Sequence, residues 1–252
     1  MTKEYETLDA SGTSNDVSLY AKSTIFQTNK DELNLSYGYR FRKISDEIGA
    51  YNVSTDKHSH AIYGEVSGYN RVPKGIINYK FKLTAGKLSN DSDYANRLNT
   101  YTKTEGNFIK FNGKIDYLQA LNKHLNFHTT LSWQQANKFL DGSEKMNIGG
   151  INGVRAYSSG DGSGDKGILS RTELIYQTKI KGLSLNAFFD IGSVGNKSKS
   201  LNTIKGYGVG VNYQKPNDYF IQFTYARKIG FNENVSSDKD KGKIWFIVGK
   251  VF

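Results

Sequence analysis

One arginine, Arg155, lies near the middle of a glycine-rich segment that spans residues 148–167. Glycine permits positive φ angles and close backbone approach, so such a segment can fold tightly inside a confined space. Val154 and Tyr157 flank the arginine and place its charge between two bulky anchors. Long loops in compact domains are usually functional or disordered. The chemistry that this pattern favours is a charged loop tip inserted into an interior.

Catalytic chemistry has weaker support in the same segment. Asp161 and Asp165 lie among serines, which raises the alternative of a hydrolase. No histidine is close in the sequence and no nucleophile-turn motif is visible, so this alternative lacks its base. The glycines do not form a phosphate-binding motif, because no Lys-Ser or Lys-Thr pair follows a glycine-rich turn. The sequence therefore predicts a protein that is not an enzyme and has no cofactor.

Metal binding is also not predicted. His124 and His128 are four residues apart, a spacing that binds metal on a helix. On a strand they would be about 13 Å apart at about 3.3 Å per residue, too far for one ion. His58 and His60 share a strand face beside a polar loop and are interpreted as surface residues. The chain has no cysteine, which excludes disulfides and sulfur ligands.

The elements that must position these residues are β-strands with two different faces. Between Gly206 and Tyr213, aromatic and aliphatic residues alternate with glycine and asparagine, which is the period of a strand. Clear repeats of this division occur near 33–42, 77–84, 109–117, 125–134, 183–191 and 219–226. Weaker candidates are 16–28, 58–70, 168–179 and 244–252. The polar faces are too charged for the core of a sandwich.

These segments amount to about eleven strands, many of about ten residues, the length of a tilted membrane-crossing strand. Short turns alternate with long polar links near 44–57, 88–104, 138–166, 193–204 and 229–243. Such an asymmetry of rims is typical of outer-membrane barrels. The sequence therefore predicts an antiparallel transmembrane β-barrel in the bacterial outer membrane. Aromatic residues expected in an interface belt are Tyr37, Tyr39, Tyr207, Tyr213, Tyr219 and Trp245.

Composition supports this fold class. Tyr (17) and Phe (14) are abundant and Pro (2) is rare, which argues against disorder. Mean hydropathy is −0.58 and no run of about 18 apolar residues occurs, so a helical membrane span is not predicted. The net charge of +10 raises nucleic acid as a partner, but the basic residues are dispersed, and a basic lumen wall explains them better.

Two details concern charges and the chain end. Arg171 and Glu173 share one face of the strand near 168–179 and are interpreted as a lumen-wall ion pair, with an exposed surface pair of little energetic value as the alternative. The last strand ends on Phe252, which is similar to the carboxy-terminal signal by which the barrel-assembly machinery recognises its substrates.

The glycine-rich segment resembles the signature loop of two-partner secretion transporters, which export haemolysin and filamentous haemagglutinin and belong to the superfamily of barrel-assembly insertases. Their motif reads Val-Arg-Gly-Tyr or Val-Arg-Gly-Phe, and many members have alanine third, as here. The residues that carry the loop match are Gly149, Gly150, Val154, Arg155, Ala156, Tyr157, Gly164, Asp165 and Gly167. A second family element, Phe-x-Asp-x-Gly, is matched by Phe188, Asp190 and Gly192. Phe252 is a third match.

The resemblance implies a barrel of about sixteen strands whose sixth external loop folds inward. Arg155 would then pair with Asp190, which alternation independently places on the polar face beside Ser184 and Asn186. Such a pair would act as a latch that holds the loop in one position. By the same resemblance, residues 1–252 are the carboxy-terminal part of the barrel. About five strands and the periplasmic POTRA-type recognition domains would lie outside this chain. An odd strand count agrees with this expectation, since bacterial barrels are even-numbered.

The function implied by the resemblance is a passive pore component that exports a large, unfolded, β-rich partner protein. Its other expected partners are outer-membrane lipids and the barrel-assembly machinery, with no nucleic acid or small-molecule substrate. A first alternative is an insertase of the same superfamily. Further alternatives are an outer-membrane barrel enzyme, which requires a catalytic cluster at the rim, and a soluble β protein. The identity of the secreted partner does not follow from the sequence.

Overall fold

The fold is an antiparallel sheet of eleven strands in which every strand pairs with its neighbours in chain order. The computed structural model describes residues 9–197, 200–230, 232, 235–236 and 240–250. The predicted number of strands is confirmed. The strands are β1 (Ala10–Gln27), β2 (Asp31–Ile48), β3 (Val53–Val72), β4 (Gly75–Asn90), β5 (Gly106–Ala120), β6 (Leu125–Ala136), β9 (Lys166–Gln177), β10 (Leu183–Gly195), β11 (Asn202–Gln214), β12 (Tyr219–Lys228) and β13 (Gly242–Lys250).

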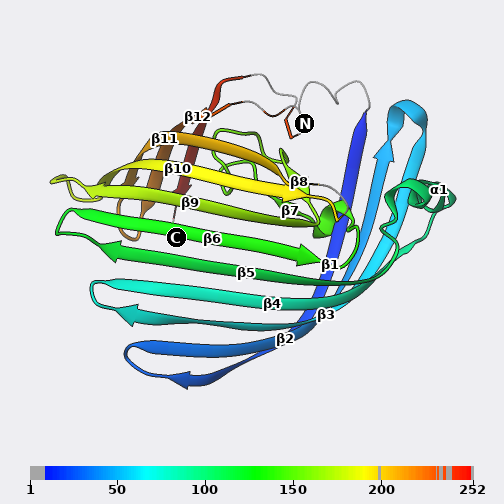
Figure 1. Ribbon diagram of the computed structural model, residues 1–252, viewed down its shortest axis with the longest axis horizontal. Coiled ribbons are helices and arrows are strands. Elements are labelled where there is room, and N and C mark those ends of the chain that lie inside the picture. The colour runs from blue at the N-terminus through cyan, green and yellow to red at the C-terminus, as the bar shows by residue number, and fades with distance from the viewer. Residues whose placement is uncertain (1–8, 198–199, 231, 233–234, 237–239, 251–252) are drawn as a thin grey trace.

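The sheet curves around an interior, and one long connection enters that interior (Figure 1). This connection joins β6 to β9 and contains two short paired strands, β7 (Met146–Asn147) and β8 (Ser163–Gly164). The short turns lie at one rim, on the left of Figure 1, and the longer connections lie at the other. The predicted asymmetry of the rims is therefore confirmed.

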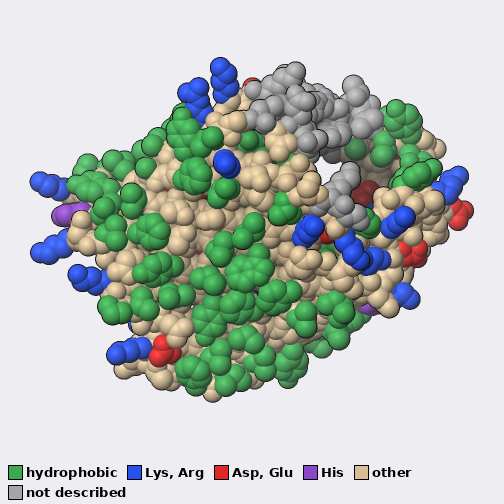
Figure 2. Space-filling view, in the orientation of Figure 1, with side chains coloured by type: hydrophobic (Ala, Val, Ile, Leu, Met, Phe, Trp, Pro, Cys, Tyr) green, Lys and Arg blue, Asp and Glu red, His purple; other side chains and the backbone are tan. Residues whose placement is uncertain are grey.

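The two faces of the sheet differ in chemistry, as the alternation predicts. Leu185, Phe189 and Val209 point outward and are 42%, 44% and 57% exposed. Their neighbours Asn186 and Asp190 point inward and are buried. Figure 2 shows hydrophobic side chains spread over the outer face, with lysine and arginine side chains mainly at the rims. Because a strand alternates its side chains, this sheet presents an apolar exterior and a polar interior.

Two of the predicted links differ from the structure. The link predicted at 44–57 is wrong, because β2 and β3 continue as a paired ribbon and leave only the 3-10 turn Gly49–Tyr51 between them. The polarity of these residues suggested a loop. Cross-strand pairing nevertheless extends the hairpin through them. The link predicted at 88–104 contains a helix, α1 (Asp93–Thr102). Ser92 caps it by accepting a hydrogen bond from the Ala95 amide at 3.3 Å.

No helix in the described part of the chain is long and apolar enough to cross a membrane. The terminal residue Phe252 lies outside the described residues.

Candidate functional site

The loop between β6 and β9 is a compact structure with its own backbone hydrogen bonds. The Ile148 amide donates to the Gly162 carbonyl at 2.9 Å, and the Val154 amide donates to the Ile148 carbonyl at 2.6 Å. The Gly150 amide donates to the Tyr157 carbonyl at 3.1 Å, with Gly150 at φ +89°. Because this left-handed conformation strains other residues, glycine is required at the turn. These bonds bring the 154–157 segment back against the start of the loop.

Gly153 is packed too closely for a side chain. A Cβ atom at this position would lie 2.2 Å from the Ile148 carbonyl oxygen and 2.6 Å from the Gly149 carbonyl oxygen. Both obstacles are backbone atoms of the same turn, so they cannot rotate away.

We expect Gly153→Ala to open this turn and to destabilise the loop by about 1–3 kcal/mol, the usual cost of overpacking a filled site. Limited proteolysis should then cut within residues 148–162 at a higher rate than in the parent. Gly142→Ala is the matched control, because a Cβ there would meet nothing within 4 Å. Equal cleavage rates in the two variants would contradict this account of the turn.

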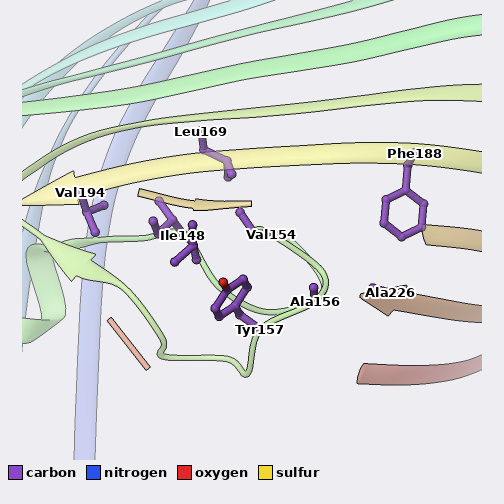
Figure 3. Packing of buried hydrophobic residues seen from close by; sticks show 9 residues of the cluster. Ile148, Val154, Ala156, Tyr157, Leu169, Phe188, Val194 and Ala226 are labelled. Atoms are coloured by element: carbon purple, nitrogen blue, oxygen red, sulfur yellow. The ribbon is translucent and has the colours of Figure 1, made fainter. Parts of the chain in front are cut away.

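A hydrophobic cluster attaches the loop to the inner wall of the sheet. Its loop members are Ile148, Val154, Ala156 and Tyr157, and Figure 3 shows them packed against side chains of the wall. The wall members are Leu169, Phe188, Val194, Ile204 and Ala226. Tyr157 is 1% exposed, and the Lys228 ammonium lies 4.8 Å from its ring centroid. Burial of this apolar surface stabilises the loop in one position against the wall.

Glycines on the inner face of β11 leave the room that this packing needs. A Cβ at Gly206 would lie 2.7 Å from the Ala156 Cβ, and one at Gly208 would lie 2.5 Å from the Phe188 ring. The methyl group of Ala156 therefore packs directly over Gly206. Gly206 accepts the loop tip where a larger side chain would exclude it, and Gly208 leaves room for the Phe188 ring.

Arg155 and Asp190 form a bidentate ion pair in the interior. The Arg155 Nε and Nη2 atoms donate to the two Asp190 carboxylate oxygens at 2.9 and 2.8 Å. The Arg155 backbone amide also donates to Asp190 Oδ2 at 3.1 Å. The Arg155 side chain is 3% exposed and that of Asp190 is 0% exposed. The structure thus brings together the two residues of the expected latch in the geometry in which guanidinium and carboxylate bind most strongly.

Three further contacts fix Arg155. Its Nη1 donates to Glu173 Oε2 at 2.9 Å, and its guanidinium carbon lies 3.4 Å from the Phe188 ring centroid. The Trp245 indole donates to the Arg155 carbonyl at 2.7 Å. Burial by itself lowers the pKa of the guanidinium, but hydrogen bonds to Asp190 and Glu173 outweigh burial and raise it. Arg155 is therefore charged, and every polar group that it presents to the wall has a partner.

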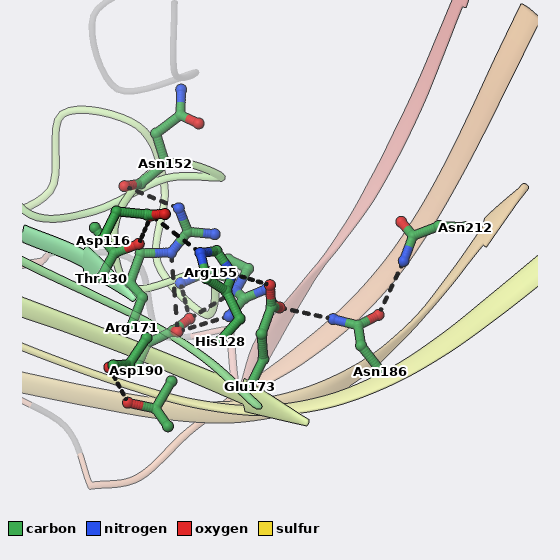
Figure 4. Close-up of polar contacts among 12 residues, drawn as sticks. Asp116, His128, Thr130, Asn152, Arg155, Arg171, Glu173, Asn186, Asp190 and Asn212 are labelled. Atoms are coloured by element: carbon green, nitrogen blue, oxygen red, sulfur yellow. Dashed lines mark hydrogen bonds and ion pairs between the residues drawn. The ribbon is translucent and has the colours of Figure 1, made fainter. Parts of the chain in front are cut away.

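The predicted pairing of Arg171 with Glu173 is wrong. Glu173 instead accepts from Arg155, from the Asn186 amide at 2.9 Å, and contacts His128 Nδ1 at 3.1 Å (Figure 4). Arg171 lies 4.0 Å from Asp190 and donates weakly to the Asn152 carbonyl at 3.5 Å. Neighbours two residues apart on a strand share a face, but the inserted loop supplies a closer cation for Glu173.

Two other residues have roles that the sequence did not indicate. His128 lies between Glu173 and Asp116, whose Oδ2 is 3.0 Å from His128 Nε2. Trp245, expected in an interface belt, points inward to Arg155 instead, so this expectation is wrong. The strand that contains Trp245 is apolar on both faces, and alternation could not distinguish its inner from its outer side. Tyr37 and Tyr207 do lie on the outer face, 58% and 47% exposed.

The other motif residues of the loop close its base. The buried Asp165 carboxylate accepts the Leu140 amide at 2.9 Å and the Lys197 amide at 3.0 Å, which ties two connections together. Gly164 and Gly167 pass close to β10, where a Cβ would lie 2.8 Å from Gly195 and 2.7 Å from Val194 respectively. Gly192 faces the loop, and a Cβ there would lie 3.0 Å from Ile148. Gly149 is enclosed similarly, because a Cβ there would lie 2.5 Å from the Ser158 carbonyl oxygen.

A second electrostatic contact holds the beginning of the loop, and we call it the proximal anchor. Its centre is the carboxylate of Glu144, which is 3% exposed. Lys110 Nζ lies 2.8 Å from it, Arg42 Nη1 lies 3.4 Å from it, and Arg40 also pairs with it. Glu144 was not predicted from the sequence, because an acidic residue in a polar link carries no local signal. The inward-facing cations of β2 and β5 were the available clue.

No group of acidic, histidine or cysteine residues suited to a metal ion occurs within the described residues. The site consists of ion pairs, hydrogen bonds and apolar packing that hold a loop inside a curved sheet. An apolar exterior, a polar interior and an inward-folded loop are the features of an outer-membrane β-barrel protein.

Comparison with known proteins then gives the family. The sequence profile of the family described as haemolysin secretion/activation protein ShlB/FhaC/HecB matches residues 1–213. The chain belongs to this family, and to the bacterial outer membrane where such barrels lie. The predicted resemblance is therefore confirmed.

Curated relatives agree with this assignment, and solved structures agree with the fold. The heme/hemopexin transporter protein HuxB of Haemophilus influenzae is 22% identical over 262 residues, 98% of this chain and 46% of the relative. CdiB from Escherichia coli superposes with a TM-score of 0.81 at 17% identity over 95% of this chain and 45% of that one. BamA from Haemophilus ducreyi lacking POTRA domains 1-3 gives 0.55 at 10% identity, covering 94% and 62%. The structural likenesses show the fold alone. The chain spans about half the length of the curated relatives it matches.

Proposed function

We propose that this chain forms the loop-bearing wall of an outer-membrane pore that exports a large, unfolded, β-rich partner protein. The single observation that supports this most directly is the buried Arg155–Asp190 pair, which fixes a long loop inside the sheet. Membership of a secretion family supplies the activity class. In this proposal the chain performs no catalysis, and the loop latch is its functional centre.

The latch explains how a pore can be both occupied and releasable. A loop held by hydrophobic contact alone would exchange among similar positions, whereas a bidentate ion pair specifies one position. Removal of either partner leaves the other charge buried without its bidentate contact. The loop therefore stays in place until both charges are solvated together. An insertase role has less support, because the family that matches is one of secretion proteins.

The test is export by the whole gene product carrying Arg155→Ala. We expect secretion of the partner protein to fall several-fold and the ionic conductance of the pore in planar bilayers to become unstable, because the loop loses its fixed position. Lys215→Ala is the matched control, since Lys215 pairs with Asp218 in an exposed turn. Export and conductance equal to the parent in Arg155→Ala would reject the role of the latch in transport.

A further inference from the structure

The inner wall of β2 to β5 carries a strong excess of positive charge. Register places Lys80 directly opposite Lys114, and Lys82 opposite Glu65, on neighbouring strands. Like charges placed directly across from each other destabilise a sheet. The fold maintains the Lys80 and Lys114 pair in spite of this cost, on the face that points to the interior.

The wall already binds a carboxylate at one end of this charged region. Glu144 belongs to the loop and forms ion pairs with Arg40, Arg42 and Lys110 in the proximal anchor. Lys110 stands on β5 four residues before Lys114 and therefore shares its face. The proximal anchor and the lysines beyond it thus form one continuous surface on which an acidic group is bound at one end.

The remaining part of this surface is open. A cavity of about 310 Å³ beside the loop is lined by Lys80, Lys82, Lys114, Lys145, Asn112 and Gln134. We call the first four of these residues the lysine strip. A second hollow of about 290 Å³ shares Lys80 and Lys82 with the first.

Few acidic groups compete for the lysine strip. Lys80 pairs with Glu65 at 3.3 Å while its own side chain stays 57% exposed. The Lys82 ammonium lies 3.7 Å from the centroid of the Tyr63 ring. Lys114 makes no ion pair within 4 Å among the described residues. The lysine strip therefore has unused capacity for carboxylates.

We propose that the lysine strip binds acidic segments of the exported polypeptide, and that Glu144 is the internal carboxylate at the end of the same surface. This inference rests on the proposed export function. Lys80 and Lys82 are two residues apart on one strand, so their Cα atoms are separated by about 6.6 Å along it. Acidic residues at alternate positions of an extended polypeptide repeat at the same interval of about 6.6 Å. An unfolded chain with acidic residues at alternate positions would match this spacing. Basic segments would meet like charge on this surface instead.

The test measures peptide binding separately from transport. A fluorescent peptide of alternating glutamate and serine is titrated against the whole gene product in detergent, and anisotropy gives the Kd. The double variant Lys80→Gln, Lys114→Gln should weaken binding about tenfold, the loss expected for two partly solvated charge contacts. The matched control is Lys179→Gln, Lys181→Gln, which removes equal charge from an exposed turn at the rim.

The two outcomes are distinct from those of the export test. The inference is supported if the acidic peptide binds more weakly to the Lys80→Gln, Lys114→Gln variant but not to the Lys179→Gln, Lys181→Gln variant. A neutral glutamine-serine peptide should not bind at all. Equal Kd values in both variants, or equal binding of the neutral peptide, would overturn the inference. Planar-bilayer conductance without peptide, measured on the same preparations, tests the pore itself. A conducting pore that does not discriminate between the peptides would leave the proposed function standing and reject the strip.

Discussion

Replacing Asp190 with alanine is expected to lower the free energy of unfolding by about 3–5 kcal/mol, the typical effect of breaking a buried ion pair. The reason is the state of Arg155 after the change. Its side chain is 3% exposed and would lose two guanidinium contacts and one backbone contact to the same carboxylate. Glu173 would remain as its one anionic partner within hydrogen-bonding distance. The loop would then be expelled or the arginine would stay buried with too few acceptors.

Unfolding in guanidinium chloride, in detergent and followed by tryptophan fluorescence, measures this effect. Trp245 is a suitable reporter because its indole donates to the Arg155 carbonyl. The double variant Arg155→Ala, Asp190→Ala completes a mutant cycle and should be less destabilised than the sum of the single variants. Asp218→Ala controls for loss of an exposed acidic residue. A loss in Asp190→Ala no larger than in this control would show that the pair is not held as described.

The strands were predictable because burial imposes the same rule on every residue of a barrel strand. Each residue faces either the lipid or the interior, and between Gly206 and Tyr213 the apolar and small polar residues alternate accordingly. The boundaries were less predictable, since the β2–β3 hairpin continues past the apolar region through backbone pairing and polar side-chain contacts such as that of Ser45 with Asp56 at 2.6 Å. Helix α1 has a recognisable cap at Ser92 but little apolar pattern, with Ala95 as its buried residue. Its existence depends on packing against the rim.

The site was predictable only in part, for a different reason. Asp190 could be assigned to the inner face by alternation, but its partner came from family resemblance and not from residue spacing. Glu173 has an arginine two residues away on its own strand, yet it binds Arg155 from the loop. Which charges meet in an interior is decided by where an inserted loop comes to rest, and no local pattern encodes that position.

The loop is held at two separate places, which gives the structure a property that neither anchor has alone. The latch fixes the tip to β9 and β10, while the proximal anchor fixes residue 144 to β2 and β5. The loop therefore connects walls that are not neighbours in the sheet. Loss of one anchor should free only the adjoining part of the loop, so the two parts can be distinguished by local measurements.

Glu144→Ala is expected to destabilise the protein by about 2–3 kcal/mol, less than the loss expected for Asp190→Ala. Removal of the carboxylate leaves Arg40, Arg42 and Lys110 facing one another around an apolar methyl group. The loss is smaller because these cations are 13–21% exposed, so solvent partly screens their repulsion. Asp16 also continues to pair with Arg42 at 2.6 Å.

Hydrogen exchange followed by mass spectrometry locates the effect of Glu144→Ala. Protection should fall within residues 140–146, where the Glu144 carbonyl also accepts from Lys110 and Gln134, and should be retained around Arg155. Glu144→Gln separates charge from shape, because it keeps the side-chain volume while removing the anion. Glu47→Ala, on an exposed strand end, controls for the change in net charge. If exchange rises equally at the loop start and at Arg155, the two anchors act as one unit. Opening of the pore would then require a single concerted release.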